Sequence, residues 1–484
     1  MKLSDLLAAQ VVNHVPDVNV LGITDDSRRV QPGFVFCAVR GLQSDGHAYV
    51  DEAIHKGASS ILCEQPVEGA GEKDVPCLVV PGLAALRGRF AAAFHGEPSR
   101  RIKCVGVTGT NGKTSVAWFI ANLLEQLGQA AAYLGTIGWG RVTHLQTTDS
   151  TTASAIVNQD RLACLADNGV RWAAMETSSH ALDQARVDDV AFAVGVFTNL
   201  TRDHLDYHRT MEAYGDAKRR LFELPSIGMG VINVDDPFGQ GLAGDLRSAL
   251  PITTFGRKGD VSFTDLRSTP EGIRGRWTSP WGQAAFVLPL VGEFSVSNAA
   301  AALTTLCALG LDFEALVDAQ RRMPAVPGRM QIYRMPEGPM VVVDYAHTPD
   351  ALKVVLSALR PHCRGELVCL VGCGGDRDRG KRPLMASVAE SLADVIWLTS
   401  DNPRSEDPET ILAEMRAGLA GRSCVYECID RADAITRAIT CCSKDDVVLI
   451  AGKGHEEYQE LATGRIPFSD RALVAELLRQ KARG

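Results

Sequence analysis

Apolar runs and amphipathic stretches alternate through the middle of the chain. The runs that we expect to form strands lie at 104–108, 172–176, 190–197 and 229–234. Between them, stretches such as 115–127 and 212–224 have a helical pattern, and a further helix is expected at 296–309. Strands that alternate with helices are typical of a parallel sheet with crossover helices. The stretch 251–290 is poorer in helix formers, so we expect antiparallel strands there, at an edge of the sheet.

A second alternating series begins after the turn signals Pro324, Pro327 and Gly328. Its strands are expected at 340–344, 366–371, 395–399 and 446–451, and its helices at 350–359 and 382–392. The pattern predicts a Rossmann-like domain.

The N-terminal part, residues 1–98, has shorter elements. Strands are expected at 22–24, 34–39 and 58–63, and a helix at 50–57. A weak linker follows at 96–101, and 484 residues suffice for about three domains. The predicted fold class is therefore α/β with three domains. These are a small N-terminal domain (1–98), a central P-loop domain with a mostly parallel sheet (99–328) and a C-terminal Rossmann-like domain (329–484).

Composition narrows the choice of partners. The net charge is −8, so the chain lacks the basic excess that attracts nucleic acids or anionic membranes, and no apolar stretch approaches the ~18 residues of a membrane-spanning helix. Residues 1–20 do not have the pattern of a secretory leader. The thirteen cysteines include no CxxC pair, and we expect reduced thiols in the cytoplasm.

A glycine-rich segment, GVTGTNGKTS at 106–115, follows one predicted strand and opens the next helix. Glycines allow backbone N–H groups to approach a phosphate, Lys113 supplies charge, and the Thr114 hydroxyl is suited to Mg²⁺. The first glycine, Gly106, lies one residue earlier than in the usual GxxxxGK[ST] spacing. The strand, loop and helix context still predicts a phosphate site.

Two further segments follow predicted strands of the same sheet. Glu176 ends one strand, in METSSH, and is placed to complete a metal site. His204 and His208, in TNLTRDHLDYH, have the i, i+4 spacing of zinc ligands, but Leu205 stands where HExxH requires glutamate. We therefore reject zinc and keep His204 as a candidate ligand or phosphate contact.

Together these motifs resemble the Mur ligase family of peptidoglycan synthesis. The resemblance rests on GTNGKT at 109–114, ETSSH at 176–180 and NLTRDHLDYH at 199–208, and it continues through DYAHTP at 344–349, GCGGDRD at 372–378 and GKGHE at 452–456. It covers nearly the whole chain in order. The family implies three domains, which bind a UDP-sugar, ATP and the incoming amino acid, respectively.

The resemblance also implies a reaction. ATP phosphorylates the D-glutamate side-chain carboxylate of UDP-N-acetylmuramoyl-L-alanyl-D-glutamate, and an amine then attacks the acyl phosphate through a tetrahedral intermediate. Phosphorylation replaces the carboxylate oxygen, a poor leaving group, by phosphate, a good one. Because the carboxylate and ATP are both anions, the site needs positive charge to bring them together. The family further implies Mg²⁺, two ions being expected, a monomer, and a carbamylated lysine at Lys218, whose carbamate would be an oxygen ligand.

The site residues that the family pattern assigns fall into four groups. The catalytic residues would be Lys113, Glu176, His204 and Lys218, and the metal ligands Thr114, Glu176, His204 and the carbamate of Lys218. ATP would contact Gly109, Thr110, Asn111, Gly112, Lys113, Thr114, Ser115, Asn298, Arg329 and Asp344. The UDP-linked dipeptide would contact Asp25, Ser27, Leu42, Gln43, Ser44, Ser150, Thr151, Thr152, Ser178, Gln184 and Arg186, with Ser150 in place of the expected asparagine. The amino acid would contact Arg377, Asp401, Asn402, Pro403, Arg404, Gly452 and Glu456.

The segment SDNPR at 400–404 indicates which amino acid is added. In the family, arginine after Asn-Pro marks members that use meso-2,6-diaminopimelate. This amino acid differs from lysine by a distal carboxylate, which the planar guanidinium of Arg404 can bind with two parallel hydrogen bonds. Glu456 is suited to an ammonium. Arg329, just after the Pro-Gly hinge, is suited to reach the phosphates when a domain moves.

Two alternatives stay open. Another ligase of the same mechanism, either a lysine-adding or other Mur ligase or a folylpolyglutamate synthase, would share the phosphate loop but lack the segment 401–404. A nucleotide-binding regulatory or scaffold protein needs only the phosphate loop and leaves the C-terminal motifs unexplained.

Overall fold

The computed structural model describes residues 1–7, 15–41, 44–67, 74–269, 272–334, 338–421 and 424–481. The chain forms two compact units. The first comprises Met1–Ser262, Ser279–Trp281 and Ala300–Leu316, and the second Phe263–Thr278, Gly282–Ala299 and Val317–Gly484. No helix among the described residues is long and apolar enough to cross a membrane.

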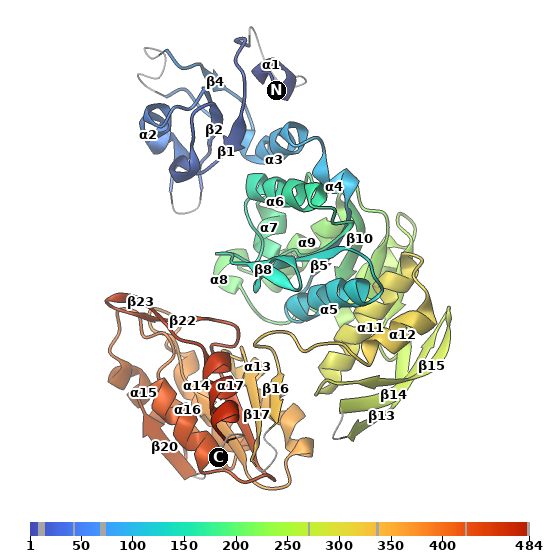
Figure 1. Cartoon of the computed structure of the whole chain (residues 1–484), viewed down its shortest axis with the longest axis vertical. Helices are drawn as coiled ribbons and strands as arrows, with labels where there is room; N and C mark the ends of the chain where they lie inside the picture. Colours follow the sequence, from blue (N-terminus) through green and yellow to red (C-terminus); the bar gives the residue numbers. More distant parts are fainter. Residues whose placement is uncertain are drawn as a thin grey trace. The chain divides into compact units, whose positions relative to one another are not determined.

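A four-stranded sheet forms the N-terminal part of the first unit (Figure 1). Its strands pair in the order β1 (Gly22–Thr24), β2 (Phe34–Ala38), β3 (Ser60–Cys63) and β4 (Cys77–Val79), and all three pairings are parallel. The short helix α1 (Leu3–Leu6), the helix α2 (Val50–His55) and the longer α3 (Leu83–Phe94) accompany the sheet. Apolar residues on opposite faces of the strands form two separate clusters, so both faces are covered.

The first unit also holds an eight-stranded sheet, in the order β12-β11-β10-β5-β9-β6-β7-β8. The six strands from β12 to β6 pair in parallel, and β7 and β8 add antiparallel pairs at one edge. The strands are β5 (Lys103–Thr108), β6 (Ala131–Gly135), β7 (Gly138–Arg141), β8 (His144–Gln146), β9 (Trp172–Glu176), β10 (Phe192–Phe197), β11 (Gly230–Asn233) and β12 (Ile252–Phe255).

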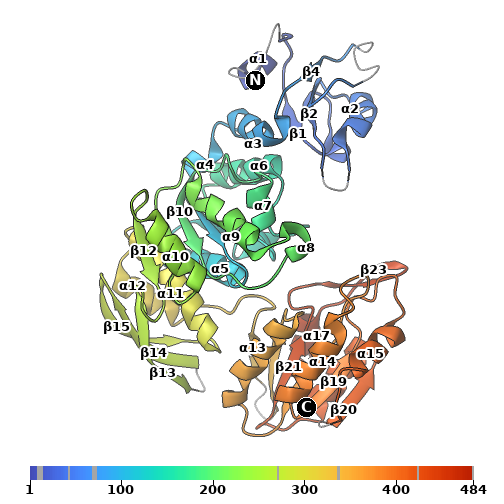
Figure 2. The ribbon, with the colours of Figure 1, turned by 180° about the vertical axis from the view of Figure 1, so that it is seen from behind.

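Helices lie on both faces of this sheet (Figures 1 and 2). They are α4 (Pro98–Arg101), α5 (Lys113–Gln126), α6 (Ala155–Asp167), α7 (Ser179–Asp183), α8 (Leu205–His208), α9 (Met211–Arg219) and α10 (Pro237–Leu246). The helix α5 packs on β5, β6 and β9, and ten of its residues are buried, from Thr114 to Leu124. The predicted strands and helices of this part are thus confirmed to within a few residues.

The stretch 251–290 differs from the expectation. The strand β12 is at the sheet edge but pairs in parallel with β11, and β13 (Ser262–Thr269), β14 (Gly272–Ser279) and β15 (Gly282–Leu288) form a separate three-stranded sheet. Trp277, fully buried, stacks on Phe286 and donates a hydrogen bond from Nε1 to Gln320 Oε1 at 3.0 Å. The helices α11 (Glu293–Ala308) and α12 (Phe313–Gln320) follow. The three strands therefore pack among themselves and against α12, as a sheet separate from the larger one.

The second unit holds a six-stranded sheet in the order β16-β17-β21-β18-β19-β20. Among these described strands, β16 alone is antiparallel to its neighbour. The strands are β16 (Gln331–Arg334), β17 (Met340–Asp344), β18 (Leu367–Val371), β19 (Val395–Thr399), β20 (Cys424–Cys428) and β21 (Val447–Ala451). The expected strands of this part are confirmed.

Helices cover both faces of the six-stranded sheet, because alternate residues of its strands join two different clusters. Val342, Cys369 and Leu398 pack with α13 (Pro349–Leu359), α14 (Lys381–Leu392) and α15 (Pro408–Arg416). Val343 and Leu370 pack with α16 (Arg431–Thr440) and α17 (Asp470–Lys481). A hairpin of β22 (Tyr458–Leu461) and β23 (Gly464–Pro467) precedes α17 and was not predicted.

Candidate functional site

Four neighbouring parallel strands of the first unit, in the order β10-β5-β9-β6, end at the same edge of the eight-stranded sheet. The phosphate loop follows β5, Glu176 ends β9, the segment 198–208 follows β10, and Thr136 follows β6. In open α/β sheets ligands bind outside the carboxyl ends of the strands. The candidate site of this unit is therefore built from residues that are up to about one hundred positions apart in the sequence.

The phosphate loop is tied to the segment after β10. Thr110 N donates to Asn199 O at 2.8 Å, Asn111 N to Asn199 Oδ1 at 2.9 Å, and Thr198 Oγ1 to Asn111 O at 2.6 Å. Lys113 is the first residue of α5, and its Nζ donates to Gly109 O at 2.8 Å and to Thr110 O at 2.9 Å. The ammonium thus lies over the loop, at a helix N-terminus, where a phosphate would be attracted.

Glu176 is fully buried beside this loop. Its Oε2 accepts hydrogen bonds from Thr114 Oγ1 at 2.9 Å and Thr136 Oγ1 at 3.2 Å. Its Oε1 accepts from Thr136 N at 2.9 Å and from the hydroxyl of Tyr133. All four donors are neutral, so these bonds orient the carboxylate without cancelling its charge.

Lys218 is 1% exposed on α9. Its Nζ lies 4.2 Å from the ring centroid of Tyr214, whose hydroxyl donates to Thr110 Oγ1 at 3.2 Å. Burial, and then the positive charge of Lys113, hold the pKa of Lys218 well below its usual value. A lower pKa favours the neutral amine, the form to which CO₂ adds.

His204 lies at the start of α8 with a left-handed backbone (φ 52°), and its Nε2 is 3.5 Å from Asp203 Oδ2. Its ring packs edge to face on His180, with centroids 4.9 Å apart. Burial, together with His204 and His208, lowers the pKa of His180 to about 4, and burial also lowers the pKa of His204. The lowered pKa values favour the neutral form of these imidazoles. No cluster of three or more His, Cys, Asp or Glu side chains with metal-site geometry occurs among the described residues.

The residues expected to bind the UDP-linked dipeptide are partly brought together. Thr152 Oγ1 donates to Glu176 O at 2.7 Å and accepts from Ser178 N at 3.1 Å. Arg186 Nη1 donates to Thr152 O at 3.0 Å, and its Nε donates to Gln184 Oε1, also at 3.0 Å. These four residues therefore form one patch next to Glu176.

The other described residues of that group make separate contacts or none that reach this patch directly. Thr151 shares a hydrogen bond of 3.0 Å with Thr136, whereas Ser150 is exposed. Asp25 Oδ1 accepts from Ser154 Oγ at 3.3 Å, and Ser27 Oγ donates to Glu52 Oε2 at 3.0 Å. Ser44 is exposed. Leu42 and Gln43 lie outside the described residues.

Sequence reasoning missed Arg87 on α3. Its Nε lies 3.5 Å from Asp25 Oδ2. Burial lowers the pKa of Arg186, and the positive charge of Arg87 lowers it further. Arg87 is one of two arginines in an alanine-rich helix, and nothing in the sequence around it indicates this contact. Tyr133 and Thr136 were also missed, although Thr136 directly follows a strand end of the same sheet.

In the second unit the corresponding edge gathers the predicted amino-acid site. The loops that follow β17, β21, β18 and β19 carry Tyr345, Gly452, Arg377 and Arg404, and these strands are consecutive in the sheet. Gly452 has φ +117°, and a Cβ there would lie 2.4 Å from Asp401 Oδ2, so only glycine fits this approach. Arg404 and Arg377 both flank Gly374.

A buried network joins the predicted residues of this edge. Asn402 Nδ2 donates to Glu456 Oε2 at 2.8 Å. Lys453, fully buried and missed from the sequence, donates from Nζ to Asn402 Oδ1 and to Glu456 Oε2, both at 2.9 Å. Asn402 and Glu456 are thereby fixed by a cation that lies between them.

The remaining residues expected to bind ATP belong to the second unit. Asp344, at the end of β17, accepts from Met330 N at 2.7 Å and Ala346 N at 2.8 Å, and burial raises its pKa. Arg329 lies over the Tyr345 ring, 4.3 Å from its centroid, and its Nε is buried without an acceptor among the described residues. Asn298 is half-buried on α11. Their contact with ATP stays a prediction.

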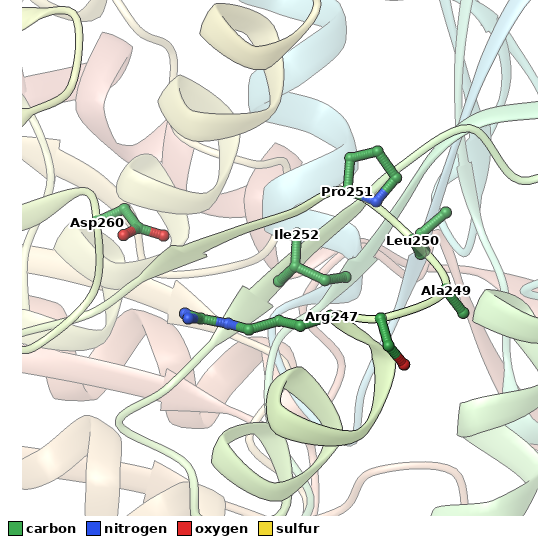
Figure 3. Close-up of a pocket in the computed structure, with 7 residues that line it drawn as sticks. Arg247, Ala249, Leu250, Pro251, Ile252 and Asp260 are labelled. Atoms are coloured by element: carbon green, nitrogen blue, oxygen red, sulfur yellow. The ribbon is translucent and has the colours of Figure 1, made fainter.

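A pocket of about 530 Å³ lies in the first unit along the segment that connects α10 to β12 (Figure 3). Arg247, Pro251 and Asp260 are among the residues that line it. Because this pocket is at the amino end of β12, it is at the sheet edge opposite the phosphate loop. Its lining includes none of the predicted site residues that the structure describes.

With the geometry in place, comparisons with known proteins define the class: the chain belongs to the Mur ligase family. Three family models match the chain. The model of the "Mur ligase family, catalytic domain" matches residues 19–95, that of the "Mur ligase middle domain" matches 107–306, and that of the "Mur ligase, glutamate ligase domain" matches 328–454. The fold is the α/β fold of this family, with three domains.

Individual relatives are similar over nearly the full chain. The UDP-N-acetylmuramoyl-L-alanyl-D-glutamate--2,6-diaminopimelate ligase of Pseudomonas syringae pv. tomato is 46% identical over 454 residues, 93% of each chain. The enzyme of the same name from Coxiella burnetii is 42% identical over 97% of each chain. A solved structure of a ligase of that name has a TM-score of 0.73 at 35% identity and covers 100% of this chain and 99% of its own.

The geometry around Gly109 makes a testable prediction about the phosphate loop. Gly109 has φ +146°, and a Cβ there would lie 1.8 Å from Thr198 Oγ1 and 3.1 Å from Asn199 N. We expect Gly109→Ala to displace the loop and to weaken ATP binding about tenfold or more, measured by calorimetry. Gly241→Ala is the matched control, because a Cβ at this position of α10 meets nothing within 4 Å. An unchanged ATP affinity in Gly109→Ala would contradict the role assigned to the loop.

Proposed function

We propose that this chain is an ATP-dependent ligase that adds meso-2,6-diaminopimelate to the D-glutamate side chain of UDP-N-acetylmuramoyl-L-alanyl-D-glutamate, a step of peptidoglycan precursor synthesis. The observation that carries the proposal is Arg404, which lies at the carboxyl end of β19 among the loops of the predicted amino-acid site. The names of relatives that are 42–46% identical over nearly the full chain support it.

The first chemical step joins two anions. An oxygen of the glutamate side-chain carboxylate attacks the γ-phosphorus of ATP, ADP leaves, and an acyl phosphate forms. Lys113 and the N-terminus of α5 supply positive potential beside the phosphates. Because they are held in place before the reaction, they stabilise the charge of the transition state without reorganising.

The second step makes the amide. The uncharged amine of diaminopimelate attacks the carbonyl carbon of the acyl phosphate and loses a proton. The tetrahedral intermediate then expels phosphate. Arg404 would hold the distal carboxylate of diaminopimelate, and the patch of Thr152, Ser178, Gln184 and Arg186 would hold the dipeptide beside Glu176.

The first unit contains residues that fit Mg²⁺. Thr114 and Glu176 offer a hydroxyl and a buried carboxylate 2.9 Å apart, and hard cations prefer oxygen ligands. Lys218 fits as a carbamate, because burial favours its neutral amine, and His204 would complete the set. When bound, Mg²⁺ would neutralise charge on the phosphate oxygens. A monomer in the cytoplasm stays a prediction from the family resemblance.

The proposed reaction predicts phosphate release that depends on the amino acid. With ATP and the UDP-linked dipeptide present, diaminopimelate should accelerate phosphate release far more than lysine does. Release that is independent of any amino acid would instead favour a regulatory ATPase. Release that requires glutamate and a folate acceptor would favour a folylpolyglutamate synthase.

Truncation of Arg404 tests the amino-acid site directly. Removing a charge-assisted contact with two hydrogen bonds costs on the order of 2–4 kcal/mol, so Arg404→Ala should raise the KM for diaminopimelate roughly 30- to 1000-fold. The KM for ATP and for the UDP-linked dipeptide should change much less, and steady-state kinetics with each substrate varied in turn measure all three. An unchanged KM for diaminopimelate would refute the assignment.

Lys218 tests the proposed carbamate. Lys218→Ala removes the oxygen ligand that the carbamate would supply, and we expect at least about a hundredfold loss of kcat in steady-state assays. The neighbouring Arg219→Ala, which removes an ion pair with Asp245 at the surface, serves as the control and should retain activity. Full activity of Lys218→Ala, together with an unmodified amine in a crystal, would exclude the carbamate.

A further inference from the structure

Two cysteines of the four-stranded sheet are in contact with each other. Cys63 ends β3 and Cys77 begins β4, and a hydrogen bond joins their Sγ atoms, which are 3.5 Å apart. In the parallel register Cys63 lies opposite Val79 and Cys77 opposite Ile61, so the thiols are offset by two residues on one face of the sheet. Both pack in the same apolar cluster. The sheet therefore holds a pair of reduced thiols side by side.

The two thiols differ in exposure and in acidity. Cys63 is fully buried, whereas Cys77 is partly exposed. The hydrogen bond that Cys63 donates lowers the pKa of Cys77, and the same bond, together with burial, raises the pKa of Cys63. Cys77 is therefore the thiol that reaches solvent and ionises more readily, and the thiolate is the form that reacts with oxidants.

Three other cysteines have different surroundings. Cys37, on β2 of the same sheet, is fully buried in the cluster on the opposite face, and burial raises its pKa. Cys104, on β5, is also fully buried, and burial raises its pKa to about 12. Cys164 is exposed on α6, and its Sγ accepts a hydrogen bond from Asn168 Nδ2 at 3.7 Å. A buried thiol with a raised pKa reacts slowly, and an exposed thiol needs a second thiol to form a bridge.

The position of the pair at two strand ends allows a disulfide to form. A disulfide requires sulfur atoms about 2 Å apart, so closing the gap from 3.5 Å needs an approach of about 1.5 Å. The strand β4 has three residues and is an edge strand that pairs with β3 alone in its sheet. Cys63 is the last residue of β3. Both cysteines therefore adjoin chain that leaves the sheet, where a small shift breaks few ladder bonds.

The residue that follows Cys63 is bonded to a neighbouring loop. Glu64 Oε2 accepts a hydrogen bond from Arg40 N at 3.0 Å, and Glu64 N donates to His47 Nε2 at 3.2 Å. Arg40 and His47 lie on either side of Ser44 in the sequence, and Ser44 is a predicted contact of the UDP-linked dipeptide. A shift of the end of β3 is thus passed through Glu64 to this loop.

We propose that Cys63 and Cys77 form an oxidation site, which a hydroperoxide converts to a disulfide. The bridge draws the end of β3 back along β4, displaces Glu64 and weakens binding of the UDP-linked dipeptide. The weakened binding rests on the function proposed above, whereas the formation of the bridge does not.

Hydrogen peroxide is the simplest oxidant for this reaction. The thiolate of Cys77 attacks one peroxide oxygen, an S–O bond forms as the O–O bond breaks, and hydroxide leaves. Sγ of Cys63 then attacks the sulfur of the resulting sulfenic acid and expels its OH group, which departs as water with the proton of Cys63. The two thiols lose two electrons and two protons, and one hydrogen peroxide becomes two molecules of water.

Peptide mapping of the full chain tests whether the bridge forms. Trypsin places Cys63 and Cys77 in separate peptides, 57–73 and 74–87, and each peptide has one cysteine. After treatment with hydrogen peroxide and alkylation of the remaining thiols, we expect the two peptides to be joined. Their mass should lie about 2 Da below the sum of the two reduced peptides, and dithiothreitol should separate them.

Single substitutions test the order of the two steps. In Cys63→Ser the reaction should stop at the sulfenic acid of Cys77, which dimedone labels. Cys77→Ser should form no bridge at Cys63. Cys37→Ala and Cys164→Ser are matched controls, one buried and one exposed, and should leave the yield of joined peptide unchanged. Thermal unfolding of each reduced variant checks that it folds like the wild type.

Two further measurements follow the effect of the bridge. On oxidation, hydrogen exchange at the amides of Arg40 and Glu64 should quicken, whatever ligand the protein binds. The affinity for UDP-N-acetylmuramoyl-L-alanyl-D-glutamate, measured by calorimetry, should fall about threefold or more and return with dithiothreitol. The affinity for ATP should stay the same, because the phosphate loop belongs to a different sheet. Cys77→Ser treated with peroxide should keep the affinity of the reduced protein.

The outcomes separate this inference from the proposed function. Oxidation of Cys164 without joined peptides 57–73 and 74–87 would overturn the oxidation site. Joined peptides with unchanged exchange and unchanged affinity would overturn the effect passed through Glu64. If the reduced protein does not bind the UDP-linked dipeptide, the proposed function fails instead, and the joined peptides and exchange rates still decide whether the bridge forms and moves Glu64.

Discussion

Parallel pairing of strands is the constraint on which the rest of this structure depends. Because the carboxyl ends of parallel strands meet at one edge of a sheet, the loops that follow them come together whatever their separation in the sequence. In the first unit this joins the phosphate loop, Thr136, Glu176 and the segment after β10. In the second unit it joins the loops after β17, β21, β18 and β19. Both predicted sites follow from the same topological rule.

Buried ionisable groups are the second common feature of the two sites. Glu176 and Lys218 are buried in the first unit, and Lys453 in the second. Burial of a charged group is unfavourable unless partners compensate, so such groups are retained where they do chemistry or fix other groups. Lys453 has its partners within the protein, in Asn402 and Glu456, and so its role is structural. The hydrogen bonds that hold Glu176 come from neutral donors, which leaves its charge for a cation.

Many strands and helices of the fold were predicted correctly from the pattern of apolar residues. The strands β9, β17 and β19 begin and end at the predicted residues, because continuous apolar runs between turn signals mark buried parallel strands. In the stretch 251–290 the expected strands are present, but three of them form a separate sheet. Nothing in the alternation of their residues distinguishes a strand of the main sheet from a strand of a separate one. The pairing of whole strands in the tertiary structure decides this.

The sequence by itself determined which loops carry candidate binding residues. These are a glycine-rich segment before Lys113, a glutamate at a strand end, and an arginine after Asn-Pro. Each is a local pattern, recognised from the residues next to it. The tertiary structure alone decided which distant side chains complete them. Glu460 reaches Arg404 across 56 positions, and Arg87 comes within 3.5 Å of Asp25, because a hairpin and a helix pack there. Contacts of this kind depend on how whole helices and strands pack. The residues next to Arg404 or Asp25 in the sequence do not indicate which distant element packs there.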